Sequence, residues 1–203
     1  KTICQQLENS FSDLKSKVKT IYNVIDKDSV LDKAKDNYKL DLSKQLNLVT
    51  VARVCKDKGF SRMLVLAKDL KDAGVDFKWY VIGDNFNKDE ANEIKASFEE
   101  FKDNFVWLGF LSNPHNIVKQ CDYSVLLSDD ETWGLVLTEA MILGVPCISS
   151  DFDVAFEQIK DGKIEPKHCG KCEYCRSKAK TLKIYNYTDF FEIREGLKIV
   201  GGI

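Results

Sequence analysis

Several features that would assign this sequence to a class are missing. Its 203 residues contain no apolar run that approaches the ~20 residues of a membrane-spanning helix. Neither of the two common glycine-rich phosphate motifs, G-x-x-x-x-G-K-[ST] and G-x-G-x-x-G, is present. The formal net charge of −2 provides no electrostatic basis for binding nucleic acid. These absences argue against a membrane-spanning helix, against the nucleotide-binding classes that the two motifs define, and against a nucleic-acid partner.

The start of the chain and its composition indicate a piece of a globular protein. The first residues are polar and charged, unlike a secretory signal, and residue 1 is Lys rather than Met. Hydrophobic residues make up 44% and charged residues 31%, which is ordinary for a globular domain. We therefore expect one domain with a sizeable core, belonging to a longer or processed protein.

The two histidines and most of the seven cysteines suggest no nucleophilic site. Neither histidine has the spacing of a Ser-His-Asp or Cys-His arrangement, and His115, after Pro114, is expected to cap or pack at a helix start. Cys55, Cys121 and Cys147 lie in or beside apolar segments, as reduced buried cysteines do. This pattern favours a reducing compartment, so we expect a cytoplasmic protein.

The remaining cysteines form a separate pattern near the C-terminus. Cys169, Cys172 and Cys175 have C-x2-C-x2-C spacing beside His168, which suits a structural zinc or part of an iron–sulfur cluster. A fourth ligand is not obvious, because adjacent His168 and Cys169 rarely both reach one metal. Free thiols and a disulfide remain alternatives. We treat residues 166–203 as a Cys-containing tail of uncertain structure, ending in a strand and a helix over 185–203.

Hydrophobic patterns along the chain alternate between strand and helix. Strands are predicted over 18–26, 46–54, 77–82, 105–108, 123–127 and 147–150. Helices are predicted over 2–16, 29–35, 60–70, 88–101, 116–120 and 156–159, and in a segment that starts near Gly134 and contains Glu139. Such alternation is typical of an α/β fold with a doubly wound, parallel, Rossmann-like sheet. These sheets bind ligands at the carboxyl ends of their strands, where Arg53, Gly83, Gly109 and Glu131 lie.

Two carboxylates flank the predicted start of the helix near Gly134. Glu131 lies in the loop before it and Glu139 lies within it, eight positions later. The free N–H groups at a helix start attract anions, so the arrangement suits a ligand with a central phosphate and hydroxyls at both ends. The alternative is a solvated acidic loop followed by one surface glutamate.

Two cations follow the predicted strand 46–54. Arg53 and Lys58 are five positions apart at a strand-to-helix turn, and a guanidinium fork with an ammonium point charge suits a diphosphate. The alternative is a solvated basic loop.

These elements together resemble a known family. Glu131-x7-Glu139 is followed by Ala140, Gly144, Pro146 and Asp151, and it is preceded by Arg53…Lys58-Gly59 and by Val106-Trp107-Leu108-Gly109. This combination resembles the retaining glycosyltransferases of family four, which have the GT-B fold, over roughly residues 19–162. The resemblance implies that residues 1–165 form the C-terminal, nucleotide-sugar-binding half of such an enzyme. Trp133 stands where the family commonly has Phe, which is a mild departure.

The resemblance also implies a role for each motif. Arg53 and Lys58 would hold the leaving diphosphate, Glu131 would lie near the donor sugar and Glu139 would bind the ribose. The backbone of Gly134, Leu135 and Val136 would contact the phosphates. Val106 and Leu108 would line the base pocket, although Trp107 between them also suits a hydrophobic core. Transfer in this family needs no bound metal, and Asp151-Phe152-Asp153 is expected to be a turn or helix cap.

The expected activity is retaining hexosyl transfer from a nucleoside-diphosphate sugar, with UDP favoured over GDP, in polysaccharide or lipopolysaccharide synthesis. The glycan or glycolipid acceptor would bind a missing N-terminal domain, so this chain alone should bind a donor but hardly transfer it. The full enzyme would be cytoplasmic, with peripheral association at the inner face of the membrane. The main alternative is a non-catalytic nucleotide-sugar-binding module. An epimerase is disfavoured, because no histidine or further carboxylate is placed to activate water.

Overall fold

The computed structural model describes residues 2–14, 17–19, 21, 23–40, 42, 46–129 and 131–150, together with the backbone of three short strands at 159–160, 163–164 and 184–186. The tail motif of Cys169, Cys172 and Cys175 lies outside these residues. The main sheet contains β1 (Leu46–Val51), β2 (Phe77–Ile82), β3 (Phe105–Gly109), β4 (Tyr123–Leu126), β5 (Cys147–Ser149) and β8 (Ile184–Asn186). A separate antiparallel pair contains β6 (Ile159–Lys160) and β7 (Lys163–Ile164).

All neighbouring strands of the main sheet are parallel, in the order β3-β2-β1-β4-β5-β8. The chain proceeds from β1 outward through β2 to β3, and then returns to place β4 on the other side of β1. The sheet therefore reverses its direction of winding between β1 and β4. This is the switch point at which open parallel sheets bind their ligands. The predicted doubly wound α/β fold is thus confirmed.

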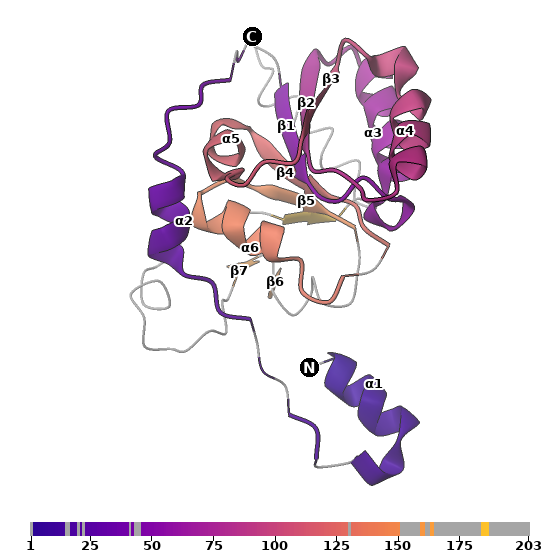
Figure 1. Cartoon of the computed structure of the whole chain (residues 1–203), viewed down its shortest axis with the longest axis vertical. Helices are drawn as coiled ribbons and strands as arrows, with labels where there is room; N and C mark the ends of the chain where they lie inside the picture. Colours follow the sequence, from indigo (N-terminus) through magenta and orange to yellow (C-terminus); the bar gives the residue numbers. More distant parts are fainter. Residues whose placement is uncertain are drawn as a thin grey trace.

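Helices cover both faces of this sheet, as Figure 1 shows. One face carries α3 (Phe60–Asp72) and α4 (Lys88–Ser97), and the short turn η3 (Glu99–Phe101) follows α4. The opposite face carries α5 (His115–Gln120) and α6 (Leu135–Ile142), with α2 (Lys27–Lys33) packed against both of them. The N-terminal residues form α1 (Thr2–Ser10) and η1 (Ser12–Leu14), and η2 (Lys56–Lys58) precedes α3.

Two hydrophobic cores result, one on each face. Leu48 of β1 belongs to the core under α3 and α4, whereas its neighbour Val49 belongs to the core under α5 and α6. Both side chains are fully buried. Successive side chains of a strand point to opposite faces, so a strand that is covered on both sides is mostly apolar. This pattern explains why the central strands were predictable from their composition.

Three predicted elements differ from the structure. Residues 18–26 form no strand in their described part, and Ile21 and Val24 are more than nine-tenths exposed. Instead, Asp26 caps α2, with its carboxylate accepting from the Ser29 N–H at 3.1 Å. The strand expected to reach residue 54 ends at Val51. Ile159, expected at the end of a helix, lies in strand β6, while residues 156–158 lie outside the described part.

Candidate functional site

Four loops meet at the carboxyl edge of the sheet, one after each of the strands β1 to β4. Because these strands are parallel, the loops that follow them lie at the same edge. The loop after β1 carries Arg53 and Lys58, and the loop after β4 carries Glu131. Since β1 and β4 are neighbours, these two loops flank the switch point of the sheet.

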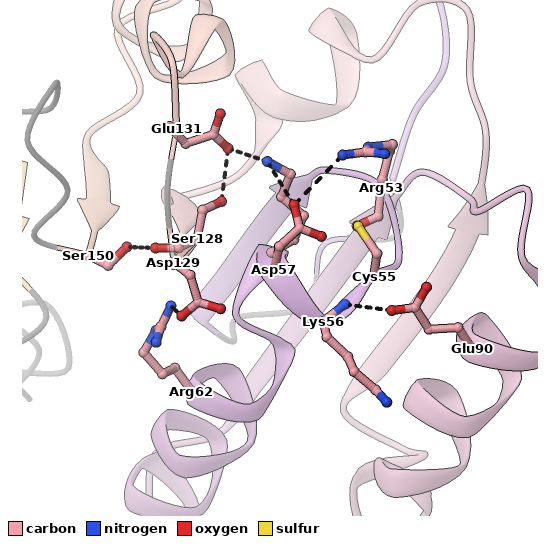
Figure 2. Close-up of polar contacts among 11 residues, drawn as sticks. Arg53, Cys55, Lys56, Asp57, Arg62, Glu90, Ser128, Asp129, Glu131 and Ser150 are labelled. Carbon is pink, nitrogen blue, oxygen red and sulfur yellow. Dashed lines mark hydrogen bonds and ion pairs between the residues drawn. The ribbon is translucent and has the colours of Figure 1, made fainter. Parts of the chain in front are cut away.

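Lys58 and Glu131 are in direct contact across the switch point, and Figure 2 shows the polar contacts of Glu131. The Lys58 Nζ atom lies 2.8 Å from Glu131 Oε1, and the Ser128 hydroxyl donates to the same oxygen at 2.9 Å. Both charged side chains are largely buried, with 14% and 16% of their surfaces exposed. A largely desolvated ion pair with a second hydrogen bond to its carboxylate is better defined than an exposed one. The structure therefore brings together two of the predicted site residues that are 73 positions apart in the sequence.

Asp57 lies between the two predicted cations. Its Oδ2 atom is 3.7 Å from Arg53 Nη2 and 3.6 Å from Lys58 Nζ. The Cys55 thiol, and then the Lys58 and Arg53 cations, hold the pKa of the Asp57 carboxyl below its usual value. Asp57 is therefore an anion at neutral pH. A phosphate that approached both cations would compete with this carboxylate.

Close packing of backbone holds the loops after β1 and β4 together. Gly59 has φ +70°, and a Cβ atom added there would lie 1.7 Å from the carbonyl oxygen of Leu127. The Asp129 N–H donates to the Asp57 carbonyl at 2.9 Å, and Arg62 Nε donates to the Leu127 carbonyl at 2.9 Å. The glycine after Lys58 is thus required by contact between the start of α3 and the end of β4.

A cavity of about 670 Å³ opens at the same edge, beside Arg53. Its lining comes from the ends of β1 and β2, from the loops after β1, β2 and β3, and from the first residue of α4. The exposed rings of Phe86 and Phe110 are part of this lining. Gly83, in the turn after β2, has φ +144°, and a Cβ atom there would lie 1.9 Å from the Ala52 carbonyl oxygen. The volume is in the range of small-molecule sites.

The predicted helix around Glu139 is confirmed as α6. Gly134, with φ +66°, precedes its first residue, Leu135, which is 41% exposed, whereas Val136 is half-buried against the core. The Glu139 carboxylate is 29% exposed, and its Oε2 atom lies 3.6 Å from His115 Nε2. Glu139 and Glu131 therefore contact different groups, on the two sides of the helix start.

The predicted base-pocket residues lie in β3. Val106 and Leu108 are partly buried and pack against the core under α5 and α6. Trp107 points to the other face, where its ring stacks on Phe60 with a centroid distance of 5.9 Å. The side chains of this strand serve the two cores, so any contact that Val106 and Leu108 make with a ligand would involve the backbone.

A family comparison decides the class of this chain. The model of the family described as "Glycosyl transferases group 1" matches residues 32–175, which include all the site residues described above. The chain belongs to this family.

Relatives and solved structures agree with the assignment. An uncharacterised 41.2 kDa protein in the cps region of Klebsiella pneumoniae is 30% identical, and the match covers 73% of this chain and 40% of that protein. The O-antigen biosynthesis glycosyltransferase WclY of Escherichia coli is 28% identical over 70% of this chain and 40% of its own length. The structure of Anabaena Alr3699/HepE in complex with UDP and glucose shares the fold, with a TM-score of 0.60 at 20% identity, over 71% of this chain and 41% of that one.

This group 1 glycosyl transferase chain therefore spans about 40% of the length of the curated relatives it matches. Its α/β, Rossmann-like fold is shared with solved GT-B glycosyltransferases. Across the described ranges, no helix is both long and apolar enough to cross a bilayer. The same ranges contain no group of three or more His, Cys, Asp or Glu side chains that could hold a metal ion.

Sequence reasoning missed several residues of this candidate site. Asp57 and Ser128 contact the predicted Lys58 and Glu131, and His115 contacts the predicted Glu139. Asp57 lies between the predicted Arg53 and Lys58 in the sequence, and Ser128 lies in the same loop as Glu131. Both could therefore have been found from their position beside predicted site residues. His115 was expected at a helix start, where the structure places it, but nothing in the sequence indicated its contact with Glu139, which is 24 positions away on another helix.

Proposed function

We propose that this chain is the donor-binding, C-terminal domain of a retaining glycosyltransferase of family four, and that it binds a nucleoside-diphosphate sugar. The contact between Lys58 and Glu131 at the switch point carries the proposal. This contact joins a cation that suits a phosphate to a carboxylate that suits sugar hydroxyls, at the edge where such sheets bind nucleotides.

The diphosphate would bind to Arg53, Lys58 and the free backbone N–H groups at the start of α6. Arg53 is 64% exposed and borders the cavity, so its guanidinium can contact a ligand without breaking a buried interaction. On binding, the phosphates replace Asp57 as the counter-charge of both cations. The same cations and amides then stabilise the charge that develops on the leaving diphosphate as the glycosidic bond breaks.

The two glutamates would bind the two ends of the ligand. Glu139 lies on α6, past the amides that would hold the phosphates, and it would accept hydrogen bonds from the ribose hydroxyls. Glu131 lies before those amides, and it would orient the donor sugar while still paired with Lys58. The backbone of Val106 and Leu108 would border the base.

We favour UDP-sugars as the donors. The full enzyme would act in the synthesis of a cell-surface polysaccharide or lipopolysaccharide. The support comes from the names of similar proteins, since WclY is an O-antigen biosynthesis glycosyltransferase and Alr3699/HepE was crystallised with UDP and glucose. The glycan or glycolipid acceptor would bind a further domain, which the greater length of the relatives allows. No cofactor would be required for transfer.

Two lysines of the same loop provide a charge-matched test. Lys58→Ala should weaken UDP binding by ~1–3 kcal/mol, the usual contribution of a charge-assisted hydrogen bond. Lys56→Ala removes the same charge, but its side chain extends away from Glu131 (Figure 2), so UDP affinity should not change. Titration calorimetry with UDP measures both, after thermal melting has shown that each variant is folded. Equal affinities for UDP in the wild type and in Lys58→Ala would exclude the proposed diphosphate site.

A further inference from the structure

His115 is a buried side chain whose hydrogen bonds fix its orientation. It is the first residue of α5, only 6% of its surface is exposed, and its Nδ1 atom lies 3.1 Å from Asn113 Oδ1. The His115 backbone N–H donates to the same oxygen at 3.3 Å. The ring is therefore held by the loop that leads from β3 into α5.

The orientation of the Asn113 amide determines which ring nitrogen carries a proton. Asn113 Nδ2 donates to the Lys33 carbonyl at 2.9 Å, which directs Oδ1 toward His115. An amide oxygen only accepts, so His115 Nδ1 must be the donor of their hydrogen bond. Nε2 then carries a proton only when the ring is an imidazolium cation.

The Nε2 atom faces Glu139. It lies 3.6 Å from Glu139 Oε2, and no hydrogen-bond partner for it exists among the described residues. This distance is slightly longer than a hydrogen bond and lies within the range of an ion pair. A buried nitrogen without a partner is costly, and the carboxylate supplies both an acceptor and the opposite charge. Glu139, at 29% exposure, remains accessible on its other side.

We propose that His115 is a positioning residue that holds Glu139 in the orientation needed to bind the ribose hydroxyls of the nucleotide. This inference rests on the proposed function, in which Glu139 binds the ribose. Contact with Nε2 occupies Oε2 and leaves Oε1 for the ligand. The path from Lys33 through Asn113 and His115 to Glu139 thus connects α2 to the ribose end of the site.

Two substitutions of His115 separate this role from simple packing. The side-chain amide of His115→Gln places its nitrogen near the position of Nε2 and can still donate to Glu139. The shorter amide of His115→Asn reaches only the position of Nδ1, so it keeps the Asn113 contact and loses the Glu139 contact. Titration calorimetry should compare UDP with 2′,3′-dideoxy-UDP in the wild type, in both variants and in Glu139→Gln.

We expect His115→Asn to weaken UDP binding by roughly fivefold and to leave dideoxy-UDP binding unchanged, as Glu139→Gln should also do. His115→Gln should retain most of the wild-type preference for UDP. A histidine that only packs would instead weaken both ligands alike in both variants, or change the melting temperature alone. Either result would overturn the inference.

The wild type provides a measurement that does not depend on the folding of a variant. In ¹⁵N NMR, the Nε2 signal of the His115 ring should move on addition of UDP but not of inorganic diphosphate. An Nε2 signal that is insensitive to UDP overturns the inference while the proposed function stands. A wild type that binds UDP without preferring it to dideoxy-UDP overturns the ribose role of Glu139 and this inference together. Failure of the wild type to bind UDP at all overturns the proposed function itself.

Discussion

The partners of Glu131 and Glu139 differ in a way that their common motif does not reveal. Glu131 lies against the Lys58 ammonium and the Ser128 hydroxyl, whereas Glu139 lies against the His115 ring. Because Glu131 already neutralises Lys58, removal of the negative charge of Glu131 would leave the Lys58 ammonium free for a phosphate. Loss of one carboxylate or of the other should therefore have different effects on the affinity for a ligand that has no sugar.

Replacement of each glutamate by glutamine tests this division. Glu139→Gln should weaken the binding of UDP and of a UDP-sugar alike, by ~1 kcal/mol for one damaged hydrogen bond. Glu131→Gln should not weaken UDP binding, but it should weaken UDP-sugar binding and, in the full enzyme, lower turnover. The measurement is a set of four affinities by calorimetry, two variants against two ligands. If Glu131→Gln impairs UDP binding as much as Glu139→Gln does, the assigned roles are wrong.

The cysteines within the described part agree with their predicted burial. Cys55, Cys121 and Cys147 are free thiols in the interior. Burial raises the pKa of Cys121 and Cys147 to about 12, and burial together with Asp57 raises that of Cys55 to about 11. Thiols with raised pKa values stay protonated and unreactive at neutral pH. Cys55 therefore acts beside Asp57 as a neutral hydrogen-bond donor.

The start of α3 is the element on which the candidate site depends most. Gly59 and Gly74 have nearly the same φ, +70° and +72°, at the start and just after the end of this helix. They differ in surroundings, because a Cβ atom at Gly59 would collide with the Leu127 carbonyl, whereas at Gly74 it would meet nothing within 4 Å. Comparison of Gly59 with Gly74 therefore separates the strain of a left-handed backbone from the cost of the contact with Leu127.

Alanine at each glycine should therefore have unequal effects. Gly74→Ala should lower the free energy of unfolding by ~1–2 kcal/mol, the strain of a side chain in the left-handed region. Gly59→Ala adds a backbone collision, so its loss should exceed that of Gly74→Ala by at least ~1 kcal/mol. It should also weaken UDP binding, because α3 must shift from β4 and carry Lys58 away from Glu131. Urea unfolding measures the first effect and calorimetry the second. Equal losses would show that the contact with Leu127 is easily relieved.

The elements that the sequence predicted best are those covered on two sides. Strands β1 to β5 were predicted to within three residues, because coverage of both faces makes their sequences mostly apolar. Residues 18–26 alternate between apolar and polar side chains, yet their described part forms no strand, and Val24 is 92% exposed. Alternation specifies a strand only where a neighbouring strand is available to pair with it, and that depends on tertiary structure.

At the scale of the whole molecule, the position of the site was predictable but its internal contacts were not. Parallel strands direct their following loops to one edge, so Arg53, Lys58 and Glu131 could be grouped from the sequence. The contacts of Asp57 with Arg53 and Lys58, and that of His115 with Glu139, could not be predicted. They depend on the directions of the side chains in three dimensions.

Because the loops of four strands form the site, ligand binding should stabilise the folded domain as a unit. At a UDP concentration of 100 times Kd, binding to the folded state alone adds ~2.7 kcal/mol to the free energy of unfolding. For a domain of this size, that increase should raise Tm by roughly 5–10 °C. The double variant Arg53→Ala/Lys58→Ala should show almost no rise at the same UDP concentration, since it has lost both diphosphate cations. Differential scanning fluorimetry over a UDP series measures the shift, with Lys56→Ala as the matched control that should behave as the wild type. A rise in Tm of the double variant equal to that of the wild type would mean that UDP binds somewhere other than this edge of the sheet.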